Sequence, residues 1–336
     1  MNSFGRIFRV HIFGESHGEC VGLTIDGCPA GLPLSVDDFV TDIERRKPGA
    51  KGTTPRTEDD IPQLKTGVFN GKTTGAPITI LFENNNTRSA DYDKLRAVPR
   101  PGHADFVASK KFGGNEDYRG SGHFSGRLTV CLVAAGVVAK RLLLTSSKGG
   151  GTIVQSTISE IGGETDLEKG LQRAIDAKDS IGGIVECKVT GLPIALGEPF
   201  FDSAESLISH AVFAIPAVRG IEFGTGFAAA KMFGSQHNDS IEDRSGKTFT
   251  NHAGGIVGGL TNSNELVFRI AIKPTSSTPK EQQTLNTETG NVEDFSVKGR
   301  HDLCIALRVP VILEAVTAMV LADLMLLEQK IPRIIS

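Results

Sequence analysis

A glycine-rich polar stretch near the middle of the chain carries the residue types best suited to chemistry. It spans residues 117–127 and reads DYRGSGHFSGR. Glycine lets the backbone take positive φ and approach a ligand closely, while arginine, histidine and serine offer hydrogen-bond donors. The apolar run 128–139 that follows predicts a buried helix, whose free N–H groups and dipole favour an anion. An ordinary tight turn is the alternative for the glycines alone, but the donors favour a site.

Histidines and arginines gather in similar loops along the chain. The loop histidines are His17, His103, His123, His237, His252 and His301, and the arginines that accompany them are Arg46, Arg100, Arg119, Arg127, Arg300 and Arg308. Arginine binds carboxylate and phosphate through paired, charge-assisted hydrogen bonds. The residues therefore predict a polyanionic small-molecule ligand and acid–base chemistry by histidine. No metal site is expected, because paired Cys/His spacing and H-E-x-x-H are missing, and the phosphate-loop and dinucleotide fingerprints are missing too.

The composition is that of a soluble globular protein. Of 336 residues, 39% are apolar and 22% charged, and the net charge is −3, so a nucleic-acid partner is not expected. The five cysteines form no C-x-x-C pair, which favours reduced thiols in a cytoplasm. No signal peptide is visible. The longest apolar segments are too short or too charged to span a bilayer, so no membrane partner is expected.

The elements that must position these loops form an α+β pattern. Strands are predicted over 8–13, 21–25 and 75–82, and a helix over 36–46 begins at a capping Ser35. Residues 84–122 show no obvious regular structure. The irregular alternation disfavours a doubly wound sheet and favours a sandwich of helices layered on antiparallel sheets. We predict a single domain, 1–336, with a weak internal duplication of about 1–145 and 180–336.

Several motifs, taken together and in order, resemble the chorismate synthase family. They are GESHG at 14–18, RPGHAD at 100–105, YRGSGHFSGR at 118–127, NHAGG at 251–255, KPTSS at 273–277 and GRHD at 299–302. The match is colinear over nearly the whole chain. Many members of the family have arginine and serine where this chain has His123 and Phe124, and proline where it has Leu303.

The resemblance implies an enzyme, a carbon–oxygen lyase that acts on phosphates. Its reaction is the anti-1,4-elimination of phosphate from 5-enolpyruvylshikimate 3-phosphate to give chorismate, in the biosynthesis of aromatic amino acids. The resemblance also implies a requirement for reduced FMN, a cytoplasmic homotetramer, and a helical layer between antiparallel sheets. It associates the region around Arg46 with NADP, which makes NADPH a candidate flavin reductant; an external reductant is the alternative.

The resemblance further implies roles for individual residues. His17 would protonate the leaving phosphate, His103 would protonate or polarise the reduced flavin, and Asp302 would help to move a flavin proton. Ser16 and Ser125 would relay protons or hold ligands. The implied substrate ligands are Arg46, Arg100, Arg127 and Arg300. The implied flavin contacts are His123, Phe124, Ser125, Pro216, Ala217, Gly258, Lys273, Pro274, Thr275, Ser276, Ser277 and Arg300.

Two other classes of function use the same residues. A non-catalytic phosphate- or nucleotide-binding protein could bind its ligand with these arginine and glycine loops and release no product. An RNA-binding module is favoured by the local arginine clusters but disfavoured by the net charge and by the presence of only two tyrosines.

Overall fold

The computed structural model describes the chain except for residues 55–57, 86–95, 146–150, 298–300 and 336. Its first sheet is antiparallel, with the strand order β1-β2-β3-β7-β4. The strands are β1 (Ser3–Phe4), β2 (Arg9–Gly14), β3 (Cys20–Asp26), β4 (Gln63–Thr66) and β7 (Ile78–Glu83). Buried and less buried side chains alternate along β7, as expected when one face of a sheet packs on the core.

The second sheet is also antiparallel and has the order β10-β13-β9-β8. Its strands are β8 (Ile153–Ile161), β9 (Gly183–Thr190), β10 (Val218–Phe223) and β13 (Leu266–Ile272). Every second residue of the apolar strand β13 is buried. The alternation therefore sets which face of this sheet points to the helices.

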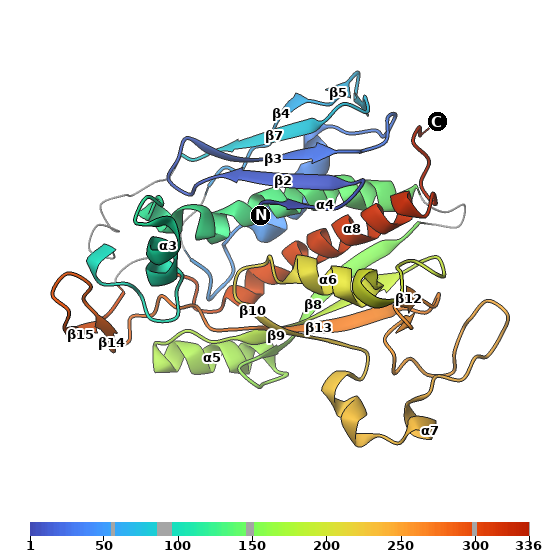
Figure 1. Ribbon diagram of the computed structural model, residues 1–336. Helices are drawn as coiled ribbons and strands as arrows, with labels where there is room; N and C mark the ends of the chain where they lie inside the picture. Colours follow the sequence, from blue (N-terminus) through green and yellow to red (C-terminus); the bar gives the residue numbers. More distant parts are fainter. Residues whose placement is uncertain (55–57, 86–95, 146–150, 298–300, 336) are drawn as a thin grey trace.

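Two long apolar helices, α4 (Thr129–Leu144) and α8 (Val309–Leu327), lie side by side between the sheets (Figure 1). Both are apolar on nearly all sides, as a helix enclosed between two layers must be. They approach each other closely at Gly136, where an ideal Cβ would lie 2.2 Å from Ala315 Cβ. The predicted α+β sandwich is confirmed, and the predicted internal duplication stays a prediction.

A buried carboxylate in α8, that of Glu314, ties this layer to its neighbours. It accepts hydrogen bonds at 2.7 Å from both terminal nitrogens of Arg45, which lies in α1 (Val40–Arg46). It also accepts from Lys140 Nζ of α4 at 2.7 Å and from the backbone N–H of Ser156 in β8 at 3.0 Å. Because Arg46 follows Arg45, this network also fixes the helix end that carries Arg46.

The predicted strands are confirmed as β2, β3 and β7, with bounds shifted by a few residues. The predicted helix 36–46 is confirmed as η1 (Val36–Phe39) followed by α1, and Asp38 accepts a hydrogen bond from the Ser35 backbone. The expectation of no regular structure over 84–122 is wrong, because α3 (Asp105–Phe112) lies there. Its sequence, DFVASKKF, presents no continuous apolar face, so its pattern gives no signal of a helix.

The remaining described elements are short or peripheral. They are α5 (Leu167–Ala177), α6 (Ala204–Val212), α7 (Gly234–His237), η3 (Arg119–Phe124), η4 (Gly126–Leu128), η5 (Phe200–Asp202), η6 (Gly226–Lys231), η7 (Ile305–Arg308), and the strand pairs β5 (Val68–Phe69) with β6 (Lys72–Thr73), β11 (Ile256–Val257) with β12 (Leu260–Thr261), and β14 (Gln282–Leu285) with β15 (Val292–Phe295). Within the described residues, the helical segment Ile305–Leu327 alone is long and apolar enough to cross a membrane, and 94% of its apolar window is buried in the protein, as in a core helix.

Candidate active site

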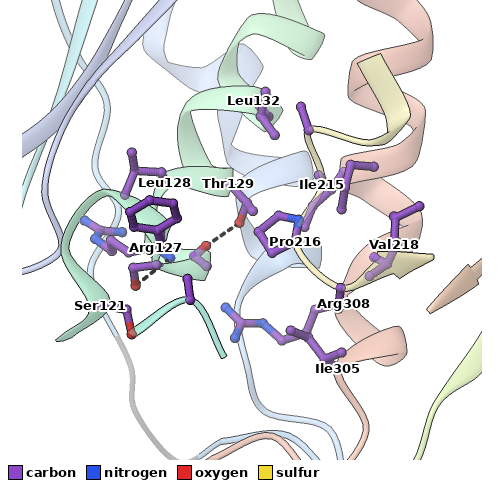
Figure 2. Close-up of a pocket in the computed structure, with 18 of the residues that line it drawn as sticks. Ser121, Arg127, Leu128, Thr129, Leu132, Ile215, Pro216, Val218, Ile305 and Arg308 are labelled. Atoms are coloured by element: carbon purple, nitrogen blue, oxygen red, sulfur yellow. Dashed lines mark hydrogen bonds between the residues drawn. The ribbon is translucent and has the colours of Figure 1, made fainter. Parts of the chain in front are cut away.

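A pocket of about 770 Å³ lies where α4 and α8 begin. The 3-10 turns η4 and η7 lead into these helices and form part of its wall. In Figure 2, Leu128 and Thr129 lie on the left of the pocket, Pro216 and Val218 on the right, and Arg308 below them in this view. A pocket of this volume is in the range that binds small molecules or cofactors.

The glycine-rich turn of η3 makes room for two predicted site residues. Gly120 and Gly122 take φ of 57° and 50°, and an ideal Cβ on Gly120 would lie 2.5 Å from His17 Nε2 and 2.9 Å from Ser16 Oγ. The backbone N–H of Ser16 donates to the carbonyl of Gly122 at 3.1 Å. Glycine at position 120 therefore lets the Ser16–His17 loop pack directly behind the pocket wall.

Two buried arginines share one buried carboxylate. Arg46 Nη2 lies 2.8 Å from Asp60 Oδ2, and Arg127 Nη1 pairs with the other oxygen of Asp60. Arg46 also donates to Thr129 Oγ1 at 3.3 Å. Burial lowers the pKa of Arg46 to about 10; Asp60 opposes this shift, while the charges of Arg308 and Arg127 add to it. One carboxylate facing two guanidinium groups leaves net positive charge in the pocket, which favours an anionic ligand.

A second charged cluster holds His103. Arg100 donates to Asp105 through Nε at 2.7 Å and Nη2 at 2.8 Å, while His103 Nδ1 lies 2.6 Å from Asp105 Oδ1. Arg100 also donates to Ser121 Oγ at 2.9 Å and Ser277 Oγ at 3.2 Å. Burial alone would raise the pKa of Asp105, but the hydrogen bonds from Arg100 and His103 outweigh it and hold that pKa well below its usual range.

A third cluster surrounds Asp302 at the start of η7. Asp302 Oδ1 accepts the backbone N–H of Thr54 at 2.9 Å, and Oδ2 accepts from Arg308 Nη1 at 3.1 Å. Arg308 Nε donates to the carbonyl of Arg46 at 3.1 Å. Arg308 therefore links Asp302 to the end of α1, which carries Arg46.

The loop after β13 brings amine and hydroxyl groups to the pocket. Lys273 Nζ donates to Ser276 Oγ at 2.8 Å and to the carbonyl of Gly102 at 2.9 Å. Burial, helped by the nearby charge of Arg219, lowers the pKa of Lys273. Thr275 Oγ1 is buried and has no hydrogen-bond partner among the described residues. These donors are suited to a phosphate.

Most of the predicted site residues lie around this one pocket. Those that line it are Arg46, Arg100, His103, His123, Phe124, Ser125, Arg127, Pro216, Ala217, Lys273, Pro274, Thr275, Ser276, Ser277 and Asp302. Ser16 and His17 lie behind Gly120. Gly258 lies in the turn between β11 and β12 and does not line the pocket. Arg300 falls outside the described residues.

Both ring nitrogens of His123 lie within hydrogen-bond distance of groups of the protein itself. Its Nδ1 lies 2.9 Å from the carbonyl oxygen of Gly14, and its Nε2 lies 3.1 Å from Asn2 Oδ1. These contacts tie the glycine-rich turn to the end of β2 and to the N-terminal segment. The neighbouring Phe124 is the more exposed of the two residues.

Sequence reasoning missed Asp60 and assigned no role to Asp105. Asp60 lies in a polar stretch without periodicity, and Asp105 stands in a quoted motif in which histidine and arginine drew attention. The available signal was electrostatic: arginines predicted to lie in a buried site need carboxylate partners. Which carboxylate serves each arginine depends on long-range packing.

Comparisons with known proteins give one family. The chorismate synthase family model matches residues 8–326. A chorismate synthase from Chitinophaga pinensis is 71% identical over 334 residues, covering 99% of this chain and 99% of that protein. A chorismate synthase from Dehalococcoides mccartyi is 43% identical over 361 residues and covers 100% of this chain and 99% of that protein.

A solved structure shows the same fold. The crystal structure of a chorismate synthase matches with a TM-score of 0.73 at 24% identity, over 97% of this chain and 93% of that one. The family model and the two relatives match this chain over nearly its full length, so the matched region spans the positions of all three charged clusters of the pocket. The chain therefore belongs to the chorismate synthase family, whose members are carbon–oxygen lyases.

Proposed function

We propose that this pocket binds 5-enolpyruvylshikimate 3-phosphate beside reduced FMN and eliminates phosphate to give chorismate. The observation that carries the proposal is the gathering of buried arginines, a histidine and a carboxylate around one pocket in a chain of this family. The substrate has two carboxylates and a phosphate, so its binding requires several fixed cations.

Arg46 and Arg127 are the proposed substrate ligands best supported by geometry. Both are buried, both line the pocket, and they share the single charge of Asp60. Arg100 is proposed too, although its Nε, Nη1 and Nη2 all donate to groups of the protein itself. Arg300 completes the proposed set from outside the described residues.

His17 and Ser16 are proposed to supply the proton that the leaving phosphate needs. His17 is 8% exposed and packs behind Gly120 at the pocket wall. Ser16 Oγ is buried and has no hydrogen-bond partner among the described residues, so its hydroxyl is not committed to another group of the described protein. A histidine suits the task because its ordinary pKa lies near neutral.

The residues around the pocket fit a flavin mononucleotide. Lys273, Thr275 and Ser276 would hold its phosphate, and the buried Thr275 Oγ1 is a donor that the protein itself leaves unused among the described residues. Pro216 and Ala217 would lie against the ring system. When bound, reduced FMN supplies the electron-transfer chemistry of the elimination. His103, Asp302 and Ser125 are proposed to hold or move protons on that side.

A cytoplasmic homotetramer is the proposed state of the protein. Phe200, Phe201, Phe227, Phe233 and Phe249 are each more than 70% exposed, which is costly for a monomer in water. Light scattering should give four times the chain mass of 35.7 kDa.

NADPH is the proposed reductant of the bound flavin, with a contact near Arg46, and this proposal rests on the resemblance to the family alone. Mixing NADPH with FMN-bound protein without oxygen tests that proposal directly.

Genetic complementation tests the proposed activity in cells. A bacterial strain that lacks its own chorismate synthase cannot grow without aromatic supplements, because chorismate is their precursor. We expect this chain to restore growth, while a variant with alanine at both Arg46 and Arg127 should not. Soluble wild-type protein that fails to restore growth would argue for a binding protein instead of an enzyme.

A further inference from the structure

The contacts of His103 decide which of its ring nitrogens carries a proton. Its Nδ1 lies 2.6 Å from Asp105 Oδ1 and 3.1 Å from Arg100 Nη2. Asp105 is ionised, because the hydrogen bonds from Arg100 and His103 hold its pKa well below the usual range despite its burial. An ionised carboxylate can only accept a hydrogen bond, and a guanidinium can only donate one.

Asp105 and Arg100 therefore require opposite protonation states of His103 Nδ1. Contact with Asp105 requires a hydrogen on Nδ1, whereas a bond from Arg100 would require a bare lone pair. The carboxylate contact is shorter by half an ångström, and a bare nitrogen at 2.6 Å from an anionic oxygen would be repelled. Arg100 has other acceptors for its Nη2, namely Asp105 Oδ1 and Ser121 Oγ, so it does not need the imidazole.

The other ring nitrogen, Nε2, has the hydroxyl of Ser121 as its neighbour. His103 and Ser121 both line the pocket, and Ser121 Oγ lies 3.5 Å from His103 Nε2, too far for a strong hydrogen bond. Asp105 itself does not line the pocket and is 15% exposed in its side chain. It can therefore act on a ligand only through His103 or Arg100.

We propose that Asp105 is a positioning residue for His103: its carboxylate holds the neutral ring as the Nδ1–H tautomer and leaves Nε2 as the nitrogen that exchanges protons with ligands in the pocket. Arg100 is part of the same hydrogen-bonded cluster. It donates hydrogen bonds to both carboxylate oxygens of Asp105 and to the hydroxyls of Ser121 and Ser277. These bonds hold the loop of His103, the glycine-rich turn and the Lys273–Ser277 loop in one arrangement. The inference rests on the proposed role of His103 but is tested separately from it.

Solid-state NMR of protein labelled with ¹⁵N only in histidine measures the tautomer directly, whatever the size of the assembly. The signals of His103 are identified by their loss in His103→Gln, and the spectra are recorded at alkaline pH, where imidazoles are neutral. We expect a protonated Nδ1 and a bare Nε2 in the wild type. In Asp105→Ala the protonated nitrogen should become Nε2, the form that free histidine favours in water.

The control is Asp26→Ala, which removes a carboxylate that pairs with Arg9 at an exposed position away from the pocket. It should leave the His103 signals unchanged. A wild-type spectrum in which Nε2 of His103 is protonated would overturn the proposal. Because this result needs no variant, the test is still decisive if Asp105→Ala does not fold. An unchanged Nδ1–H signal in folded Asp105→Ala would overturn it as well.

The kcat and KM of Asp105→Ala connect the contact between Asp105 and His103 to the proposed reaction. Removing the carboxylate that orients a metal-binding histidine typically costs about tenfold to a hundredfold, and we take that as the scale for a carboxylate behind His103. We expect kcat of Asp105→Ala to fall by that factor, with a smaller change in KM. If the wild type makes no chorismate, the proposed function fails while the tautomer result stands. If the wild type is active and the tautomer is as expected but kcat of Asp105→Ala is unchanged, the positioning role is wrong.

Discussion

Arg46 Nη2 lies 2.8 Å from Asp60 Oδ2, and the two side chains are only 3% and 1% exposed. Asp60 pairs with Arg127 as well, so one carboxylate holds both arginines that we propose as substrate ligands. A buried ion pair is costly to break, because the partner that remains is an uncompensated charge. The same carboxylate should therefore matter for both stability and ligand binding.

We predict that Asp60→Asn lowers the free energy of unfolding by about 3 kcal/mol, the range for removing one partner of a buried pair. Asp60 takes φ of 51°, a left-handed conformation that asparagine tolerates. The variant therefore removes the charge and keeps the backbone conformation. Urea denaturation measures the change. The control is Asp59→Asn at the exposed neighbouring position. Equal midpoints for the two variants would contradict the structural role of Asp60.

Gly120 should be sensitive to a single added methyl group. In Gly120→Ala the Cβ would meet His17 Nε2 at 2.5 Å, so the Ser16–His17 loop must shift. A displacement of about 1 Å at a reacting group can cost on the order of a hundredfold in rate, and we expect a loss of that size in kcat for chorismate formation.

The matched control for this variant is Gly114→Ala. Gly114 has φ of 78°, so alanine is strained there too, but an ideal Cβ at Gly114 meets nothing within 4 Å. It should keep near wild-type kcat. If both variants lose the same activity, backbone strain and not the contact with His17 is the cause.

The Glu314 network predicts how stability depends on pH. Burial would raise the pKa of Glu314, but Arg45 and Lys140 lower it below its ordinary value of 4.5. A carboxylate whose pKa is depressed by folding stabilises the protein above its unfolded pKa, and this contribution is lost as the pH falls through the folded value. Stability of the wild type should therefore decline steeply below about pH 4.5.

Glu314→Gln should remove part of that decline. The variant should be less stable than the wild type at pH 7, and its denaturation midpoint should change less between pH 5 and pH 3, an interval chosen around the ordinary glutamate pKa. Glu328→Gln, at an exposed position just beyond the same helix, serves as the control. A wild-type pH profile identical to that of Glu314→Gln would mean that the network contributes nothing measurable.

The contact between α4 and α8 predicts a cost for filling Gly136. An added Cβ would lie 2.2 Å from Ala315 Cβ, so the helices would have to separate. Overpacking of this kind typically costs about 1–3 kcal/mol, and thermal or urea unfolding of Gly136→Ala measures it. Gly234→Ala, an exposed helical glycine with nothing within 4 Å, should be neutral or slightly stabilising.

The large elements could be predicted because their patterns are local. Residues 128–139 are apolar on all sides, which identifies a helix enclosed by other layers, and α4 confirms it. The strands β2, β3 and β7 follow from short apolar runs bounded by turn residues. The helix α3 could not be predicted in this way, because a short helix with as many polar as apolar residues is stabilised by its surroundings more than by its own pattern.

The site was predictable as a set of motifs but not as a set of contacts. The loops of His103, Ser125 and Lys273 line one pocket, as their shared chemistry suggested. The pairing of Arg46 with Asp60, across 14 positions, depends on how the whole chain packs. Nor could the sequence show that donors of Arg100 are engaged by Ser121 and Ser277, because these contacts join separate loops.

Turnover without oxygen measures the proposed elimination itself. Purified protein is mixed with chemically reduced FMN and 5-enolpyruvylshikimate 3-phosphate, and phosphate and chorismate are followed together. We expect both to appear in equal amounts, and neither to appear with oxidised FMN. If folded protein that binds FMN releases neither product, or releases phosphate without chorismate, the elimination does not occur in this pocket and the proposed function is wrong.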